Sequence, residues 1–173
     1  MRKLKTPLLE EMESLQKELL IQAPVEKVFS FMDDLSKTGM HMSGSSMMMA
    51  GSKLKLEHVS GPEKGVGAGF RWSGKMLGFE LDFTVVVTKW VENAEKVWET
   101  IGMPKLIILG WYLMHLKTEP VTGGTLVSLE IQYIRPRGFF YKLLSILFAR
   151  RYAEWCVTRM LNDSKKSLEG SGD

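Results

Sequence analysis

The sequence predicts an α+β domain in which an antiparallel β-sheet packs against one long C-terminal helix. Apolar and polar residues alternate over most of the segment 53–133, as they do in strands that are buried on one face. Residues 139–168 contain neither glycine nor proline and have apolar side chains three or four positions apart, which is typical of an amphipathic helix. Strands and helices do not alternate along the chain, which argues against a parallel sheet.

The first expected elements are a strand and a short helix. Apolar residues lie among polar ones in the segment 14–22, which predicts a half-buried strand. Pro24 then suits the first turn of a helix, because the amide hydrogen that proline lacks has no partner there. The helix is expected to end at Asp33 and Asp34. Its apolar residues have helical spacing: Val25, Val28, Phe29 and Met32.

Six further strands are expected between residues 53 and 134, after a Gly-, Ser- and Met-rich loop or broken helix at residues 35–51. The clearest alternation runs from Phe79 to Val87. A long strand is expected over residues 106–118. Thr122-Gly123-Gly124 is a typical hairpin turn and separates it from the last strand.

Length and composition fit one domain over residues 1–173, with flexible ends at residues 1–12 and 170–173. Of the 173 residues, 45% are hydrophobic and 25% are charged, which excludes extensive disorder. The net charge of +3 is too small to indicate nucleic-acid binding. The single cysteine, Cys156, excludes an internal disulfide framework and favours a reducing, cytoplasmic location.

We expect no secretory signal and no transmembrane segment, because the longest apolar runs have about 11 residues and a spanning helix needs about 20. Basic residues do surround the aromatic residues at 139–141. Two interpretations stay open for this segment: a solvated helix face, or transient contact with anionic headgroups at a membrane surface. The basic residues are Arg135, Arg137, Lys142, Arg150 and Arg151.

Four segments carry a resemblance to a known family. The sequence APVEKVF at residues 23–29 resembles the strand-to-helix step that opens members of the START-like, Bet v 1-like (SRPBCC) superfamily. Residues 67–72, KVWET at 96–100 and residues 152–160 are also similar to that superfamily, in particular to its polyketide cyclase/dehydrase-like branch. The resemblance implies a helix-grip fold, with a curved antiparallel sheet wrapped around the C-terminal helix and a short helical segment after the first strand.

The resemblance also implies an internal cavity between the sheet and the C-terminal helix that binds a hydrophobic small molecule or lipid. Alternation along the strands predicts that Trp98, Tyr112 and Met114 point inward. Aromatic and apolar residues typically line such pockets. The expected ligand-binding residues are Met42, Met48, Trp72, Phe83, Val85, Trp98, Tyr112, Met114, Leu129, Tyr133, Leu144, Phe148 and Trp155.

An alternative function is a polyketide cyclase/dehydratase-like enzyme acting on an aromatic or polyketide-type substrate. Tyr112 and His41 are then the candidate catalytic residues, since the sequence offers no other paired acid and base. A third alternative is a protein-interaction module with a filled core. The chain has no HExxH, CxxC or GxSxG motif, so we expect neither a metal site nor a cofactor.

An apolar patch is expected on the outer face of the sheet. If Trp111 and Leu113 point outward, with Leu109 beside them, three large apolar side chains are exposed together. Patches of this kind usually contact a partner. A homodimer is the simplest partner to propose.

Overall fold

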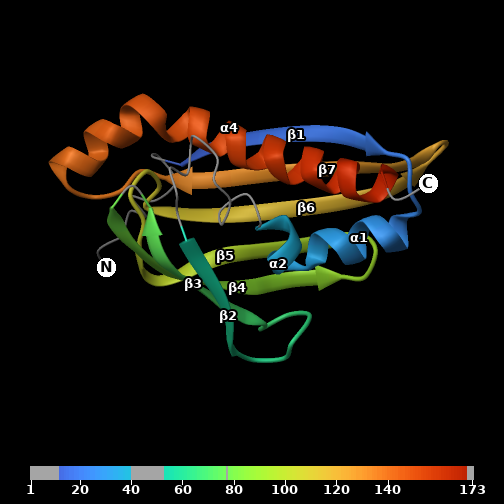
Figure 1. The fold of residues 1–173 in the computed structure, drawn as a ribbon, viewed down its shortest axis with the longest axis horizontal. Helices are drawn as coiled ribbons and strands as arrows, with labels where there is room; N and C mark the ends of the chain where they lie inside the picture. Colours follow the sequence, from blue (N-terminus) through green and yellow to red (C-terminus); the bar gives the residue numbers. More distant parts are fainter. Residues whose placement is uncertain (1–11, 40–52, 77, 171–173) are drawn as a thin grey trace, which may run out of the picture.

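Seven antiparallel strands and a long C-terminal helix form the two layers of the computed structural model, which describes residues 12–39, 53–76 and 78–170 (Figure 1). The strand order is β1-β7-β6-β5-β4-β3-β2, with antiparallel pairing throughout. The expected order of elements is confirmed. The elements are β1 (Glu13–Ile21), α1 (Val25–Asp33), α2 (Leu35–Thr38), β2 (Lys53–Ser60), β3 (Gly69–Met76), β4 (Phe79–Val91), β5 (Glu95–Lys105), β6 (Trp111–Val121), β7 (Gly124–Ile134) and α4 (Phe139–Glu169).

The strand expected from residue 106 begins five residues later, so that prediction of its start is wrong. Pairing between β5 and β6 ends at Glu99 and Leu113. Beyond that pair, the Thr100 hydroxyl accepts a hydrogen bond from the Tyr112 amide at 3.1 Å and takes the place of a backbone partner. Residues 106–110 therefore leave the sheet and turn inward. An apolar loop that packs inward has the same composition as a buried strand, which explains the error.

The end of this loop is packed too closely for any side chain. The Gly110 amide donates to the Ile134 carbonyl oxygen at 2.8 Å. A Cβ atom at position 110 would lie 2.8 Å from the carbonyl oxygen of Arg135, which is closer than such atoms approach. Glycine at this position lets the loop rest directly on the end of β7.

Helix α4 lies along β1 and β7 (Figure 1). Polar contacts hold it there: Lys17 Nζ lies 2.8 Å from Glu154 Oε1, and Lys165 Nζ donates to the Leu20 carbonyl oxygen at 2.8 Å. Most of its buried side chains are small, which lets the helix backbone approach the sheet. The buried residues are Ser145, Ala149, Ala153, Cys156, Val157, Met160, Leu161 and Ser164.

The helical spacing predicts that Phe140, Leu144, Phe148, Tyr152 and Trp155 share one buried face of α4, and this prediction is wrong in the first turns. Phe140 is 57% exposed and Phe148 is 45% exposed, whereas Leu144 and Trp155 are half-buried against the core. Figure 1 shows why, because the orange N-terminal turns of α4 project past the ends of β1 and β7. Apolar spacing identifies a helix face, but it does not say whether another element covers that face.

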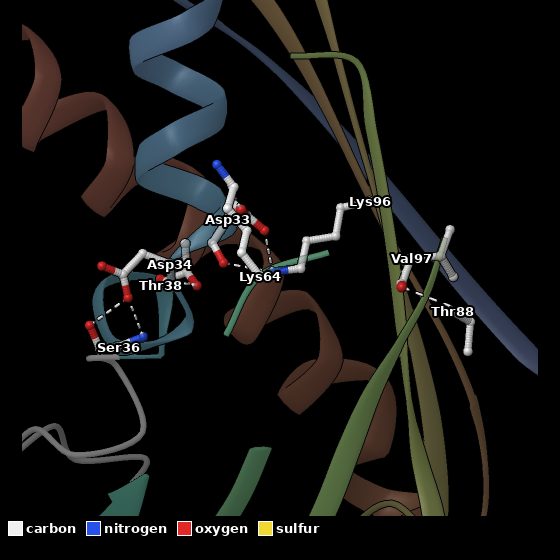
Figure 2. Close-up of polar contacts among 8 residues, drawn as sticks. All are labelled: Asp33, Asp34, Ser36, Thr38, Lys64, Thr88, Lys96 and Val97. Carbon is white, nitrogen blue, oxygen red and sulfur yellow. Dashed lines mark hydrogen bonds and ion pairs between the residues drawn. The ribbon is translucent and has the colours of Figure 1, made fainter. Parts of the chain in front are cut away.

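A buried ion pair connects α1 and α2 to the sheet (Figure 2). Lys96 projects from the inner face of β5, where its side chain is 2% exposed. Its Nζ lies 2.7 Å from Asp33 Oδ1 and donates to the Asp33 carbonyl oxygen at 2.6 Å, at the C-terminus of α1. Burial lowers the pKa of Lys96, and the Asp33 carboxylate opposes this lowering. A cation at the end of α1 also interacts favourably with the helix dipole.

We predict that Lys96→Met lowers the free energy of unfolding by about 3 kcal/mol, because it leaves the buried Asp33 carboxylate without its main partner. Urea denaturation measures the change. Lys89→Met is the matched control: Lys89 pairs with Glu95 from an exposed position, and its loss should change the free energy by less than about 1 kcal/mol. Equal stability of Lys96→Met and the wild type would contradict this role for the pair.

Candidate functional site

An internal cavity of about 70 Å³ lies between the inner face of the sheet, α2 and the second half of α4. The cavity is predominantly apolar, and its walls come from most elements of the fold. The lining residues are Leu35, Thr38, Gly39, Leu54, Trp72, Met76, Leu81, Phe83, Trp98, Leu106, Ile107, Ile108, Leu109, Tyr112, Met114, Ile131, Tyr152, Cys156 and Met160.

The strand register gathers the aromatic and apolar residues of the sheet wall. Trp72 of β3 is directly opposite Phe83 of β4. In the other half of the sheet, Met114 of β6 has Trp98 of β5 on one side and Ile131 of β7 on the other. Side chains that are opposite one another in antiparallel strands are about 5 Å apart and share a face. These two rows therefore form a continuous apolar surface beneath the helices.

The two helical walls depend on small residues and on helical spacing. A Cβ atom at Gly39 would lie 2.5 Å from the Trp72 ring, so glycine allows the end of α2 to rest on that ring. On α4, Tyr152, Cys156 and Met160 are four residues apart, so they line the same side of the helix.

The polar groups of the cavity are neutral, and none of the described residues that line it is charged. Burial, followed by the neighbouring Cys156, raises the pKa of Tyr112. The same two causes raise the pKa of Tyr152. Burial also raises the pKa of Cys156 to about 12. At neutral pH these groups are thus two phenols and a thiol, which can donate hydrogen bonds but do not act as anionic nucleophiles.

Tyr112 is the polar group best placed to meet a ligand. Its ring packs edge-on against Phe83 with a centroid separation of 6.0 Å. Within the described part of the chain, no hydrogen bond to its hydroxyl is found, although its backbone is held by Thr100. The hydroxyl is therefore available to a carbonyl or hydroxyl oxygen inside the cavity.

Five of the expected ligand-binding residues line the cavity: Trp72, Phe83, Trp98, Tyr112 and Met114. The others lie elsewhere, and for all of them contact with a ligand stays a prediction. Val85 and Leu129 are fully buried in the core, and the Tyr133 hydroxyl donates to Glu13 Oε2 at 2.9 Å. Leu144 and Trp155 pack against the core from partly exposed positions, and Phe148 is exposed. Met42, Met48 and the candidate catalytic His41 lie outside the described residues.

Sequence reasoning missed most of the wall formed by the segment 106–109. Leu109 was expected to lie beside Trp111 on the outer face, but it is 4% exposed and lines the cavity, so that prediction is wrong. The reason is the late start of β6 at Trp111, which leaves Leu109 in the loop that turns inward. Tyr152, Cys156 and Met160 were also missed, although their spacing of four residues was a usable signal.

A second hollow lies next to the cavity. It is a groove of about 1,090 Å³ that is open to solvent, between the end of β5 and the start of α4. Leu106 and Ile107 line both the groove and the cavity. The cavity and the open groove therefore adjoin at Leu106 and Ile107. Trp111 lines the groove together with Met103, Tyr141 and Arg137.

The described histidines take part in surface contacts. His115 Nε2 lies 2.6 Å from Glu95 Oε1, and His58 Nε2 lies 2.9 Å from the Pro62 carbonyl oxygen. Among residues 12–39, 53–76 and 78–170, no group of three or more His, Cys, Asp or Glu side chains is arranged to hold a metal ion. No helix in those ranges has the length and hydropathy to cross a bilayer.

Comparison with known proteins shows the same fold in several solved structures. TTHA0849 from Thermus thermophilus is 18% identical with a TM-score of 0.67, covering 93% of this chain and 100% of that one. The Zhui aromatase/cyclase from Streptomyces sp. R1128 is 10% identical with a TM-score of 0.60, covering 93% and 98%. Norcoclaurine synthase from Thalictrum flavum, in complex with dopamine and hydroxybenzaldehyde, is 11% identical with a TM-score of 0.61, covering 94% and 89%.

No protein-family model matches the chain, and no curated protein matches it in sequence. At these low identities the structural likeness establishes the fold. It confirms the helix-grip architecture, shared with Bet v 1-like proteins and polyketide aromatase/cyclases, that the sequence predicted.

We predict that the Cys156 thiol is nearly inert in the native protein. With its pKa raised to about 12, its thiolate fraction at pH 8 is roughly a thousandfold below that of an ordinary cysteine. Modification by a disulfide reagent should be slower by at least that factor than in guanidinium chloride, and it should accelerate about tenfold per pH unit below pH 11. Because the chain has one cysteine, the readout is unambiguous. Rapid, pH-independent modification of the native protein would contradict the prediction.

Proposed function

We propose that this protein binds an uncharged, mainly apolar small molecule in the cavity between the sheet and α4. The observation that carries the proposal is the cavity itself, with its apolar walls and its neutral phenol and thiol groups. A charged ligand group would lose its hydration there and would meet no described charge of opposite sign. A carbonyl or hydroxyl group, by contrast, would find a donor in Tyr112.

The size of the cavity limits what it holds without rearrangement. An engineered apolar cavity of about 150 Å³ binds benzene, so a cavity of about 70 Å³ accommodates only a smaller apolar group. Three of the lining residues are methionines, whose unbranched side chains adapt readily to a change in shape. A larger ligand would displace Met76, Met114 or Met160, or extend past Leu106 and Ile107 into the groove.

The absence of charged side chains among the described lining residues favours a neutral ligand. Cys156 is buried, and the cytoplasmic location proposed from the sequence rests on the chain having a single cysteine. A small apolar metabolite is accordingly the ligand class that we propose, in preference to a nucleotide or an acid.

We predict that the uncharged probe N-phenyl-1-naphthylamine, which is larger than the cavity, binds by displacing methionines or by extending past Leu106 and Ile107 into the groove. Its binding should quench tryptophan fluorescence, since Trp72 and Trp98 line the cavity. Cys156→Met places a longer side chain in the cavity and should weaken this binding by at least about tenfold. Arg159→Met is the matched control, because it introduces the same side chain on an exposed position of the same helix. Equal affinities of the two variants would show that the probe binds elsewhere and would count against the cavity as the site.

A cyclase- or dehydratase-like enzyme is the second candidate, and one observation favours it. Tyr112 lines the cavity, and its neutral hydroxyl has no hydrogen-bond partner among the described residues, so it can donate a hydrogen bond to a substrate carbonyl; its raised pKa makes it a weak general acid. Aromatase/cyclases and norcoclaurine synthase share the fold, but their reactions depend on residues of their own sites.

Tyr112→Phe separates the two candidates. A binding protein loses one hydrogen bond, or about two- to twelvefold in affinity for a ligand retained from the native host. An enzyme loses about a hundredfold or more in turnover, because a positioned general acid contributes that much. We predict the smaller effect, measured by native mass spectrometry and by turnover of the co-purified molecule. Turnover that Tyr112→Phe abolishes while binding survives would overturn the binding proposal.

A further inference from the structure

The first three turns of α4 present large apolar side chains to solvent. Phe139, Leu143 and Leu147 are four residues apart and are 89%, 48% and 59% exposed, so they form a stripe along one side of the helix. Ser145 and Ala149 on the other side are buried. A helix on the surface of a globular protein normally has the opposite arrangement, with its polar side outward.

This stripe is the centre of a wider apolar surface. Phe140 and Ile146 flank it on α4 and are 57% and 53% exposed. Met103, on the far side of the groove, is 95% exposed, and Tyr141 connects the two by lining the groove beside it. We call this set the α4 surface: Phe139, Phe140, Leu143, Ile146, Leu147 and Met103. Contiguous apolar surfaces of this kind are rare on soluble proteins unless something binds to them.

Exposed cations border the α4 surface. Arg137, Lys142, Arg150 and Arg151 are exposed, and no ion pair within 4 Å joins any of them to a described residue, although Arg150 interacts electrostatically with Glu154 one turn away. From residue 131 to residue 153 the chain contains no Asp or Glu. Gly138 precedes the helix without a side-chain cap, so the positive end of the helix dipole adds to this potential.

We propose that the α4 surface docks this protein onto an anionic membrane surface. Apolar side chains on one side of a helix insert at the boundary between headgroups and acyl chains, while flanking lysines and arginines reach the lipid phosphates. Each basic residue near such a surface contributes about 1 kcal/mol, which corresponds to about fivefold in partitioning. The four cations thus add electrostatic attraction to the membrane binding that the inserted apolar side chains provide.

The charge pattern favours a membrane over a second copy of the chain. A two-fold dimer through the α4 surface would place the same cations of both copies around one interface. Like charges that face one another oppose association. An anionic bilayer instead complements every cation at the border.

Docking goes beyond the proposed binding function and does not depend on it, because the α4 surface lies outside the cavity. The two features are nevertheless neighbours. The groove reaches from Tyr141 and Met103 to Leu106 and Ile107, which also wall the cavity. On a docked molecule, the groove would open next to the bilayer.

Flotation of the full-length protein with vesicles tests the proposal without any ligand. We expect binding to phosphatidylcholine vesicles that contain phosphatidylserine, much weaker binding to pure phosphatidylcholine, and release as salt is raised. Leu143→Ser/Leu147→Ser should lower partitioning at least about tenfold. Lys142→Gln and Arg151→Gln should each lower it about fivefold. All four positions are exposed, so the urea concentration at the midpoint of unfolding should be the same for these variants as for the wild type.

Matched controls use exposed residues elsewhere. The double variant Val59→Ser/Val66→Ser removes two apolar side chains that are 47% and 59% exposed. The variant Lys117→Gln removes an exposed cation of β6. Each control variant should bind vesicles like the wild type. The proposal is overturned if the wild type fails to float with anionic vesicles at low salt, or if the control variants lose as much binding. It is also overturned if light scattering shows a dimer that Leu143→Ser/Leu147→Ser separates, since a second copy would then cover the surface.

Discussion

The ion pair between Lys96 and Asp33 holds in place the helical segments that enclose the cavity. Helix α4 packs on β1 and β7, so the rest of the inner face needs another cover (Figure 1). That cover is α1 and α2, whose Phe29 packs edge-on against Trp90 with a centroid separation of 5.8 Å. Lys96 joins the sheet to the point where α1 ends and α2 begins (Figure 2). The cavity wall at Leu35 and Gly39 follows directly from that attachment.

The buried side of α4 changes in side-chain size along its length. The buried serines and alanines, Ser145, Ala149, Ala153 and Ser164, let the helix approach β1 and β7. At the cavity, α4 instead presents Tyr152, Cys156 and Met160 opposite large sheet residues such as Trp72 and Trp98. A protein interior tolerates few voids. A void of about 70 Å³ whose described wall includes a phenol is therefore a feature of this interior that needs a physical reason.

Strand alternation and helical spacing sufficed to predict the order of elements and the inward orientation of Trp98 and Met114, because both patterns report local geometry. The helix-grip fold came from the resemblance to the Bet v 1-like superfamily. It did not reveal where β5 and β6 separate, because that depends on the contact between Thr100 and the Tyr112 backbone. The buried position of Lys96 was equally hidden, since a lysine in an alternating strand normally indicates the solvent face. Both failures concern tertiary partners, which no local pattern encodes.

The exposed half of α4 is not required by the fold. Ser145 and Ala149 already seat this part of the helix against the protein, and polar residues at Phe139, Leu143 and Leu147 would preserve that packing. Exposed apolar residues in a stripe also favour aggregation, which selection normally removes from surfaces. An apolar outer side bordered by exposed cations is therefore the pattern expected of a helix that contacts an anionic surface, as proposed above. Its position beside the groove links that contact to the cavity.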